Sequence, residues 1–178
     1  VMDALIDSGM AVPQLAIESG SPYVQKHIIK KNCKLDKAIE VIRYLKSKDI
    51  IVRCYYVMGF PDETLDQLNQ SIEYAKNLGA DWSSFNIATP LVGTEMYQQY
   101  VDRGVIKDGS ELWSQASYAR RTFDTPEFSA DFINDFVYRA NLQVNFLHNP
   151  NLENGRPDIA IKLFSDVLES FPWHIFAL

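Results

Sequence analysis

Cysteine is scarce in this chain, and basic residues do not outnumber acidic ones. Its 178 residues include two cysteines, Cys33 and Cys54, which are too few for a disulfide framework or a cysteine-rich metal site. The formal net charge at pH 7 is -6, whereas surfaces that bind nucleic acids carry an excess of lysine and arginine. The composition therefore argues against nucleic acid as a partner.

Long apolar runs are also absent. No stretch approaches the roughly 20 apolar residues that a membrane-spanning helix needs, so we expect no membrane partner. Residues 1–9 read as an amphipathic helix rather than as a secretory signal, and a cytoplasmic location follows by default. Because the first residue is Val1 and this helix reads as already under way, we expect the sequence to be a fragment of a longer protein.

Short apolar segments alternate with helical patterns in the first half of the chain. Residues 13–17, 50–58 and 82–88 predict strands, and residues 22–31, 35–48 and 64–78 predict helices. This alternation predicts a parallel sheet with right-handed crossovers. The strands lack a clean polar–apolar alternation, so we expect both sheet faces to be covered. Three strands would leave an open edge, which predicts further strands before residue 1 and a barrel or partial barrel.

The pattern changes after residue 88. A loop over residues 89–93 and a short helix over residues 94–102 precede a stretch with few periodic signals. Residues 129–147 and 158–171 predict two amphipathic helices. We therefore predict an α/β unit over residues 1–105 and an α-helical C-terminal extension over residues 106–178.

The first predicted strand is followed by Glu18-Ser19-Gly20-Ser21-Pro22. Ligands bind at the carboxyl ends of parallel strands, where the Glu18 carboxylate could accept hydrogen bonds from ribose hydroxyls or pair with an ammonium group. Gly20 permits close approach of the backbone, and Ser21 with Pro22 is typical of a helix start. The alternative interpretation is a capped turn with no ligand.

The other two strands are also followed by loops rich in glycine and proline. Residues 59–64 combine Gly59, Pro61 and acidic residues that favour a helix N-terminus. Residues 89–94 offer backbone groups and an apolar wall to an adenine-like ring. Each loop alone is also explained as a plain turn, but all three are expected at the same rim of the sheet.

In this order, the segments LAIESGSP, YVMGFPDET and IATPLVGTEMY resemble the second half of the radical S-adenosylmethionine (SAM) domain. They are most similar to the branch whose members often carry an N-terminal cobalamin-binding domain. The resemblance covers about residues 1–105. It implies the second half of a partial (β/α)6 TIM-like barrel, with three parallel strands and their helices, followed by the helical extension.

The resemblance also implies a set of cofactor-binding residues and a structural acid, Glu63, at a helix start. The cofactor-binding residues are Glu18, Ser19 and Ser21 beside the ribose and amino acid portion of SAM, Tyr55, Val57 and Gly59 beside the adenine, and Pro90 and Leu91 in the loop that closes over it. Three positions depart from the family pattern: Tyr55 and Asp62 stand where glycine is usual, and Val92 stands where proline is usual.

The Cys-x-x-x-Cys-x-x-Cys motif of the family is missing from this sequence. Three thiolates hold the four-iron four-sulfur cluster whose electron cleaves SAM. The implied cofactors are therefore SAM, a cluster whose ligands lie outside this chain, and cobalamin as a candidate in the complete protein. Without the cluster motif, we do not expect the chain to be active alone. The missing N-terminal half of the barrel is the implied partner.

Several residues have a simpler interpretation than a functional one. We interpret Cys54 as a core residue and Cys33 as an incidental loop thiol. Arg120 and Arg121 read as an exposed basic pair, with binding of a substrate phosphate or carboxylate as the alternative. The tryptophans, Trp82, Trp113 and Trp173, read as packing residues.

Two other functions compete with a SAM-binding fragment. The chain could be a degenerate barrel fragment that binds or scaffolds another protein through its helical C-terminus. It could also be part of an unrelated barrel enzyme that uses Glu18 and Glu63 as an acid–base pair. A helical end packed on the sheet would weaken the former, and carboxylates that point apart would exclude the latter.

The reading frame of the complete protein tests the leading hypothesis. We expect a Cys-x-x-x-Cys-x-x-Cys motif upstream of Val1, at the distance that three strand–helix units require, because the cluster loop of the family follows the first strand. Sequencing the complete gene checks this. A reading frame that starts near Val1 would favour the scaffolding interpretation instead.

Overall fold

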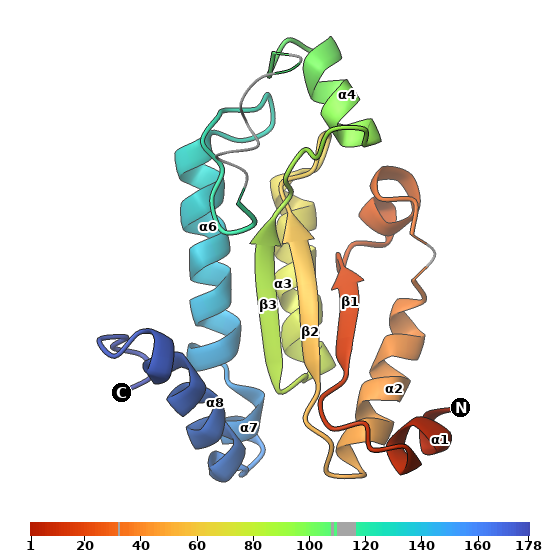
Figure 1. Cartoon of the computed structure of the whole chain (residues 1–178), viewed down its shortest axis with the longest axis vertical. Coiled ribbons are helices and arrows are strands. Elements are labelled where there is room, and N and C mark those ends of the chain that lie inside the picture. The colour runs from red at the N-terminus through yellow and green to blue at the C-terminus, as the bar shows by residue number, and fades with distance from the viewer. Residues whose placement is uncertain (32, 108, 110–116) are drawn as a thin grey trace.

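Three parallel strands form an open sheet in the computed structural model, which describes residues 1–31, 33–107, 109 and 117–178 (Figure 1). The strands are β1, Gln14–Glu18; β2, Arg53–Met58; and β3, Trp82–Ile87, in the order β1-β2-β3. Both neighbouring pairs are parallel. The predicted α/β architecture with parallel strands and C-terminal helices is confirmed.

Helices connect the strands and make up most of the C-terminal part. They are α1 (Met2–Asp7), α2 (Leu35–Lys46), α3 (Leu65–Leu78), α4 (Glu95–Asp102), α6 (Ala130–Leu142), α7 (Pro150–Glu153) and α8 (Pro157–Ser170), with π-helical turns η1 (Val24–Ile28) and η2 (Gln143–Leu147). Within the described part of the chain, no helix combines the length and apolar character needed to cross a membrane.

Local sequence signals explain most helix boundaries. Thr64 caps α3 and forms a reciprocal capping box with Gln67, and Gly79 ends the helix in the left-handed conformation. Ser129 caps α6 by accepting a hydrogen bond from the Phe132 amide. The predicted side-chain cap by Ser21 is wrong, because its buried Oγ has no hydrogen-bond partner.

One face of the sheet carries the hydrophobic core. Burial alternates along β2 and β3, so every second side chain is fully packed. These buried side chains, including Tyr56 and Phe85, share one cluster with residues of α2, α3 and α6. Cys54 belongs to this cluster, as predicted. Coverage of both faces was a wrong expectation, since the alternate residues Tyr55, Val57 and Ser84 are only partly buried.

Exposed residues of β1 and partly buried residues of β2 and β3 form layers across the open face, toward which Figure 1 looks. The register aligns Gln14 with Arg53 and Trp82 in one layer. The next layer aligns Ala16 with Tyr55 and Ser84. Side chains in layers across adjacent parallel strands are the pattern of a barrel interior. The arrangement is therefore like part of a barrel opened along one side.

Helix α6 closes the outer edge of β3, beside which it runs in Figure 1. The Asn141 side chain accepts from the Phe85 amide (3.0 Å) and donates to the Phe85 carbonyl (2.9 Å). The Asn145 side chain bonds both backbone groups of Ser83 in the same way, at 2.8 and 2.7 Å. Two asparagines one helical turn apart thus take the place of a further strand.

The two edges of the sheet differ as a result. The Ile87 amide donates to the Tyr118 carbonyl at 2.7 Å, which completes the cover on β3. On the far side of β1, by contrast, none of the described residues forms a paired strand. An unpaired strand edge is a template for another strand. The sheet can therefore grow at β1 but not at β3.

The helical C-terminal part is not a free-standing unit. Ile133, Val137 and Ala140 of α6 are buried in the same cluster as the sheet residues. This packing weakens the interpretation of a helical end that serves only a partner protein. Of the tryptophans, Trp82 packs edge-on against Phe146, whereas Trp173 is 77% exposed, so a packing role for Trp173 is wrong. Trp113 lies outside the described residues.

Removing one of the edge-covering amides should destabilise the fold. Asn145→Ala leaves the amide and carbonyl of Ser83 without partners in a buried setting, which costs about 1–3 kcal/mol for each group. We expect this loss in the free energy of unfolding measured by urea titration. Asn69→Ala, at an exposed position of α3, is the control. Equal stability of the two variants would contradict the role assigned to Asn145.

Candidate functional site

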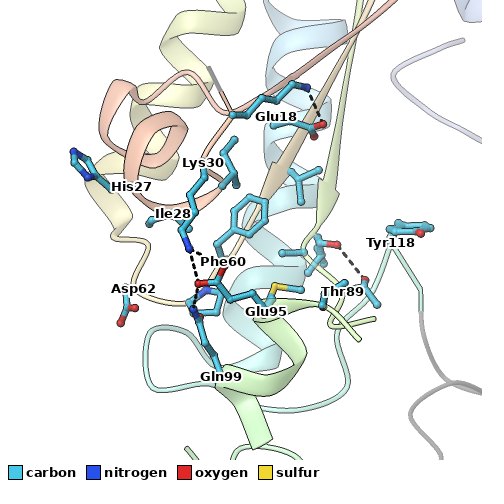
Figure 2. Close-up of a pocket in the computed structure, with 18 residues that line it drawn as sticks. Glu18, His27, Ile28, Lys30, Phe60, Asp62, Thr89, Glu95, Gln99 and Tyr118 are labelled. Atoms are coloured by element: carbon cyan, nitrogen blue, oxygen red, sulfur yellow. Dashed lines mark hydrogen bonds and ion pairs between the residues drawn. The ribbon is translucent and has the colours of Figure 1, made fainter. Parts of the chain in front are cut away.

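A cleft of about 490 Å³ lies at the carboxyl ends of the three strands (Figure 2). Its walls come from residues 27–31 after β1, residues 60–62 after β2 and residues 87–89 after β3, together with the start of α4. Tyr118 of the C-terminal part contributes the remaining wall. The volume falls within the range of small-molecule sites, and the position is where parallel sheets bind ligands.

Glu18 reaches into this cleft from the end of β1. Its backbone has φ +68°, which is uncommon for a residue other than glycine, and the pairing register shifts between Ala16 and Glu18. This irregularity places Glu18 on the cleft side, where Lys31 Nζ lies 3.2 Å from its Oε1. Lys31 Nζ also donates to the Ala16 carbonyl at 2.6 Å. The carboxylate is thus held at the strand end while remaining partly exposed.

The residues after Glu18 turn away from the cleft. Ser19 is fully buried and its Oγ lies 3.0 Å from Ser71 Oγ of α3, and the Gly20 amide donates to the same Ser71 oxygen. A Cβ at Gly20 would lie 2.4 Å from Tyr74 Cβ, so glycine here lets the turn pack on α3 rather than on a ligand. Ser21 is fully buried too. Of this predicted motif, only Glu18 lines the cleft.

The predicted residues of β2 lie at different depths. Val57 lines the cleft, and Tyr55 lies on the same face one layer further from it. Gly59 has φ +84°, and a Cβ there would come within 3.0 Å of both Arg121 Nη2 and Ile133. Its small size therefore accommodates protein neighbours, while Phe60 lines the cleft beside it.

The loop after β3 lines the cleft through residues other than those predicted. Pro90 is buried and Leu91 half-buried, whereas Ala88 and Thr89 face the cleft. The Thr89 hydroxyl donates to the Ile87 and Ser117 carbonyls, at 3.2 and 3.1 Å, which ties this loop to the C-terminal part. The assignment of Pro90 and Leu91 to the cofactor stays a prediction.

An ion pair that the sequence did not indicate crosses the rim of the cleft. Lys30 Nζ donates to both carboxylate oxygens of Glu95 at the start of α4, at 2.6 and 2.7 Å (Figure 2). Both side chains are exposed, so the pair contributes little to stability. Lys30, Glu95 and Tyr118 come from three separate segments, and no local pattern links them.

A buried acid and a buried base lie beneath the cleft floor. Glu63 Oε2 accepts from the Gly59 amide (2.7 Å) and the Phe60 amide (3.0 Å), which is the kind of structural role that the family resemblance implies. Arg121 is only 3% exposed, so the expected exposed basic pair is wrong for Arg121 although Arg120 is exposed. The alternative of a substrate-binding Arg121 is also unsupported, because its guanidinium donates to the carbonyls of Gly59 and Ala88.

The environment of Glu63 favours its neutral form. Burial raises the pKa of Glu63 to about 7, although the two backbone amides and the Arg121 charge act in the opposite direction. An acid–base pair of Glu18 and Glu63 is excluded, because Glu63 bonds to the backbone beneath the floor while Glu18 lines the cleft and pairs with Lys31.

The described residues do not fit an iron–sulfur cluster. Cys54 is buried in the core and burial raises the pKa of its thiol to about 12, which opposes the thiolate that iron needs. Cys33 is the remaining cysteine. The residues that the structure describes contain no group of three histidine, cysteine or acidic side chains that could hold a metal. An acidic side chain beside apolar Val57 and Phe60 does fit a nucleoside-like ligand such as SAM.

Residues 1–75 match the family model of the radical SAM superfamily. The chain is 28% identical over 154 residues to the cytidylyl-2-hydroxyethylphosphonate methyltransferase of Streptomyces wedmorensis, across 78% of this chain and 29% of that protein. It is 28% identical over 106 residues to an uncharacterized methyltransferase of Pyrococcus horikoshii, across 60% of this chain and 23% of that protein.

A third relative is the bacteriochlorophyllide d C-12(1)-methyltransferase of Chlorobaculum tepidum. It is 23% identical over 96 residues, across 54% of this chain and 21% of that protein. The chain thus spans less than a third of each of these relatives. All three are named as methyltransferases.

The raised pKa of Glu63 predicts a pH-dependent stability. Because the folded protein binds this proton more tightly than the unfolded chain, the contribution is complete below about pH 4.5 and is lost as the pH rises through about 7. We expect wild-type protein to lose roughly 2–3 kcal/mol of unfolding free energy, relative to Glu63→Gln, between about pH 5 and pH 8. Urea titrations measure this, with Glu169→Gln as an exposed control. Parallel pH profiles of wild type and Glu63→Gln would refute the assignment.

Proposed function

We propose that this chain, whose residues 1–75 match the radical SAM family model, forms part of a radical SAM methyltransferase and supplies one side of its SAM site. Residues 1–105 would be the C-terminal half of the partial barrel, and residues 106–178 the helical extension. The observation that carries the proposal is the Glu18 carboxylate, set at the end of β1 in a cleft of suitable volume.

Each cleft residue has a defined task in this proposal. Glu18 accepts hydrogen bonds from the ribose hydroxyls or the ammonium group of SAM, since a carboxylate offers acceptors only. Val57 and Phe60 present apolar surface to the adenine. Lys31, held between Glu18 and the Ala16 carbonyl, keeps the carboxylate aimed into the cleft. A four-iron four-sulfur cluster, with ligands outside this chain, would supply the electron for SAM cleavage.

The proposal places the cluster thiolates and the rest of the barrel outside this chain. The free edge of β1 supports this, because a parallel strand can pair there whereas β3 is covered. The layered, partly exposed face with Tyr55 and Ser84 supports it too, as such layers line barrel interiors. Methyl transfer is proposed from the names of the relatives, and the use of cobalamin only from the resemblance of the sequence to the cobalamin-associated branch. The methyl acceptor is left unassigned.

Loss of the Glu18 carboxylate should weaken SAM binding with little effect on the fold. In the complete protein with its cofactors loaded, we expect Glu18→Ala to raise the dissociation constant for SAM about tenfold or more, as a lost charged hydrogen bond would. Isothermal titration calorimetry measures the affinity, and the thermal unfolding midpoint reports the fold.

Two variants make this test specific. Glu18→Gln keeps the size of the side chain and removes its charge, so it should also bind SAM more weakly than wild type. Glu73→Ala, at an exposed position of α3, is the control. Unchanged SAM affinity in a folded Glu18→Ala protein would reject Glu18 as a binding residue.

A further inference from the structure

Arg121 links the loops that follow β2 and β3, although it lies in the C-terminal part and outside the family match over residues 1–75. We propose that Arg121 is a positioning residue for the SAM site: it does not touch SAM but holds these two loops at the spacing that the cofactor requires. The inference rests on the proposed function and adds to it a residue from beyond strand β3.

The guanidinium connects two backbone carbonyls from different strands. Arg121 Nη2 donates to the Gly59 carbonyl after β2 and, at 3.2 Å, to the Ala88 carbonyl after β3. Phe60 follows Gly59 directly and Thr89 follows Ala88 directly, and both line the cleft. A single side chain thus sets the separation of two cleft walls from beneath.

Gly59 is held from both sides of its peptide unit. Glu63 accepts from its amide at 2.7 Å, and Arg121 donates to its carbonyl. The left-handed backbone of Gly59 presents its amide to Glu63 and its carbonyl to Arg121. The interaction explains why a glycine is needed at this position, since a Cβ would meet Arg121 Nη2 and Ile133 at 3.0 Å.

The segment that carries Arg121 is itself firmly attached. The Arg121 amide donates to Asn134 Oδ1 of α6 at 2.8 Å, and the Asn134 side chain returns a bond to the Arg121 carbonyl at 2.9 Å. The guanidinium also lies over the Phe123 ring, 5.5 Å from its centre. Because α6 is hydrogen-bonded to the edge of β3, Arg121 is held at a fixed position relative to the sheet.

Arginine suits this task better than lysine. A planar guanidinium carries several donors in a fixed arrangement and stays charged when buried, whereas an ammonium group is a point charge on a flexible stem. The charge also lies close enough to Glu63 to favour its ionised form. Arg121 therefore has two separable effects: the carbonyl link between the loops and the charge beside Glu63.

The test separates these effects in the complete, cofactor-loaded protein, with SAM as the probe. Arg121→Lys keeps a charge but loses the planar arrangement, and Arg121→Met loses both. Arg120→Met is the matched control, because Arg120 is the exposed neighbour. The double variant Glu63→Gln with Arg121→Met removes both buried ionisable groups together, so the proposal can still be tested if Arg121→Met alone does not fold.

We expect Arg121→Lys and the double variant to bind SAM about tenfold more weakly than Arg120→Met in calorimetry. The double variant should recover thermal stability relative to Arg121→Met without recovering affinity. Amide hydrogen exchange at Phe60 and Thr89 should quicken in both, with or without SAM. SAM affinity equal to that of Arg120→Met, or affinity restored by Glu63→Gln, would overturn the positioning role. Wild-type protein that binds no SAM would instead overturn the proposed function.

Discussion

The covered edge of β3 is the constraint on which the rest of the structure depends. Asn141 of α6 and Asn145 of η2 satisfy the backbone groups that a further strand would otherwise take. Burying unpaired amides and carbonyls is costly, so this cover ends the sheet and fixes α6 against it. Close to α6 along the chain, Tyr118 contributes to the cleft wall, and Arg121 donates to the Ala88 carbonyl after β3.

The candidate site is consequently a joint product of the strand-containing part and the helical C-terminal part. The strands supply Glu18 and Val57, and the C-terminal part supplies Tyr118 and the guanidinium that links the loops. Without residues 106–178, the edge of β3 would lose its asparagine partners, and the Gly59 carbonyl would lose its hydrogen bond from Arg121. The division at residue 105 rests on the family resemblance alone, because one hydrophobic core contains residues from both sides of it.

The predictable part of the fold is the part with local signals. The helices that begin near Thr64 and Ser129 were predicted from the spacing of their apolar residues, and both observed caps are residue types that favour helix starts. Glu18 could be identified because it follows an apolar strand and precedes a glycine turn. Ser19, Gly20 and Gly59 also follow predicted strands, but a small residue there allows close approach of either a ligand or a neighbouring part of the protein. Here their neighbours are Ser71, Tyr74, Arg121 and Ile133.

By itself, the sequence determined the order of the elements, the parallel sheet and the rim on which three glycine-containing loops meet. It also determined that this chain cannot provide three thiolates for a cluster, since it contains two cysteines. Only the tertiary structure decided which side of each loop faces the cleft, that Arg121 is buried, and which sheet edge is free. The reason is physical: these outcomes depend on contacts such as Arg121 with Gly59, 62 positions apart, which no local pattern records.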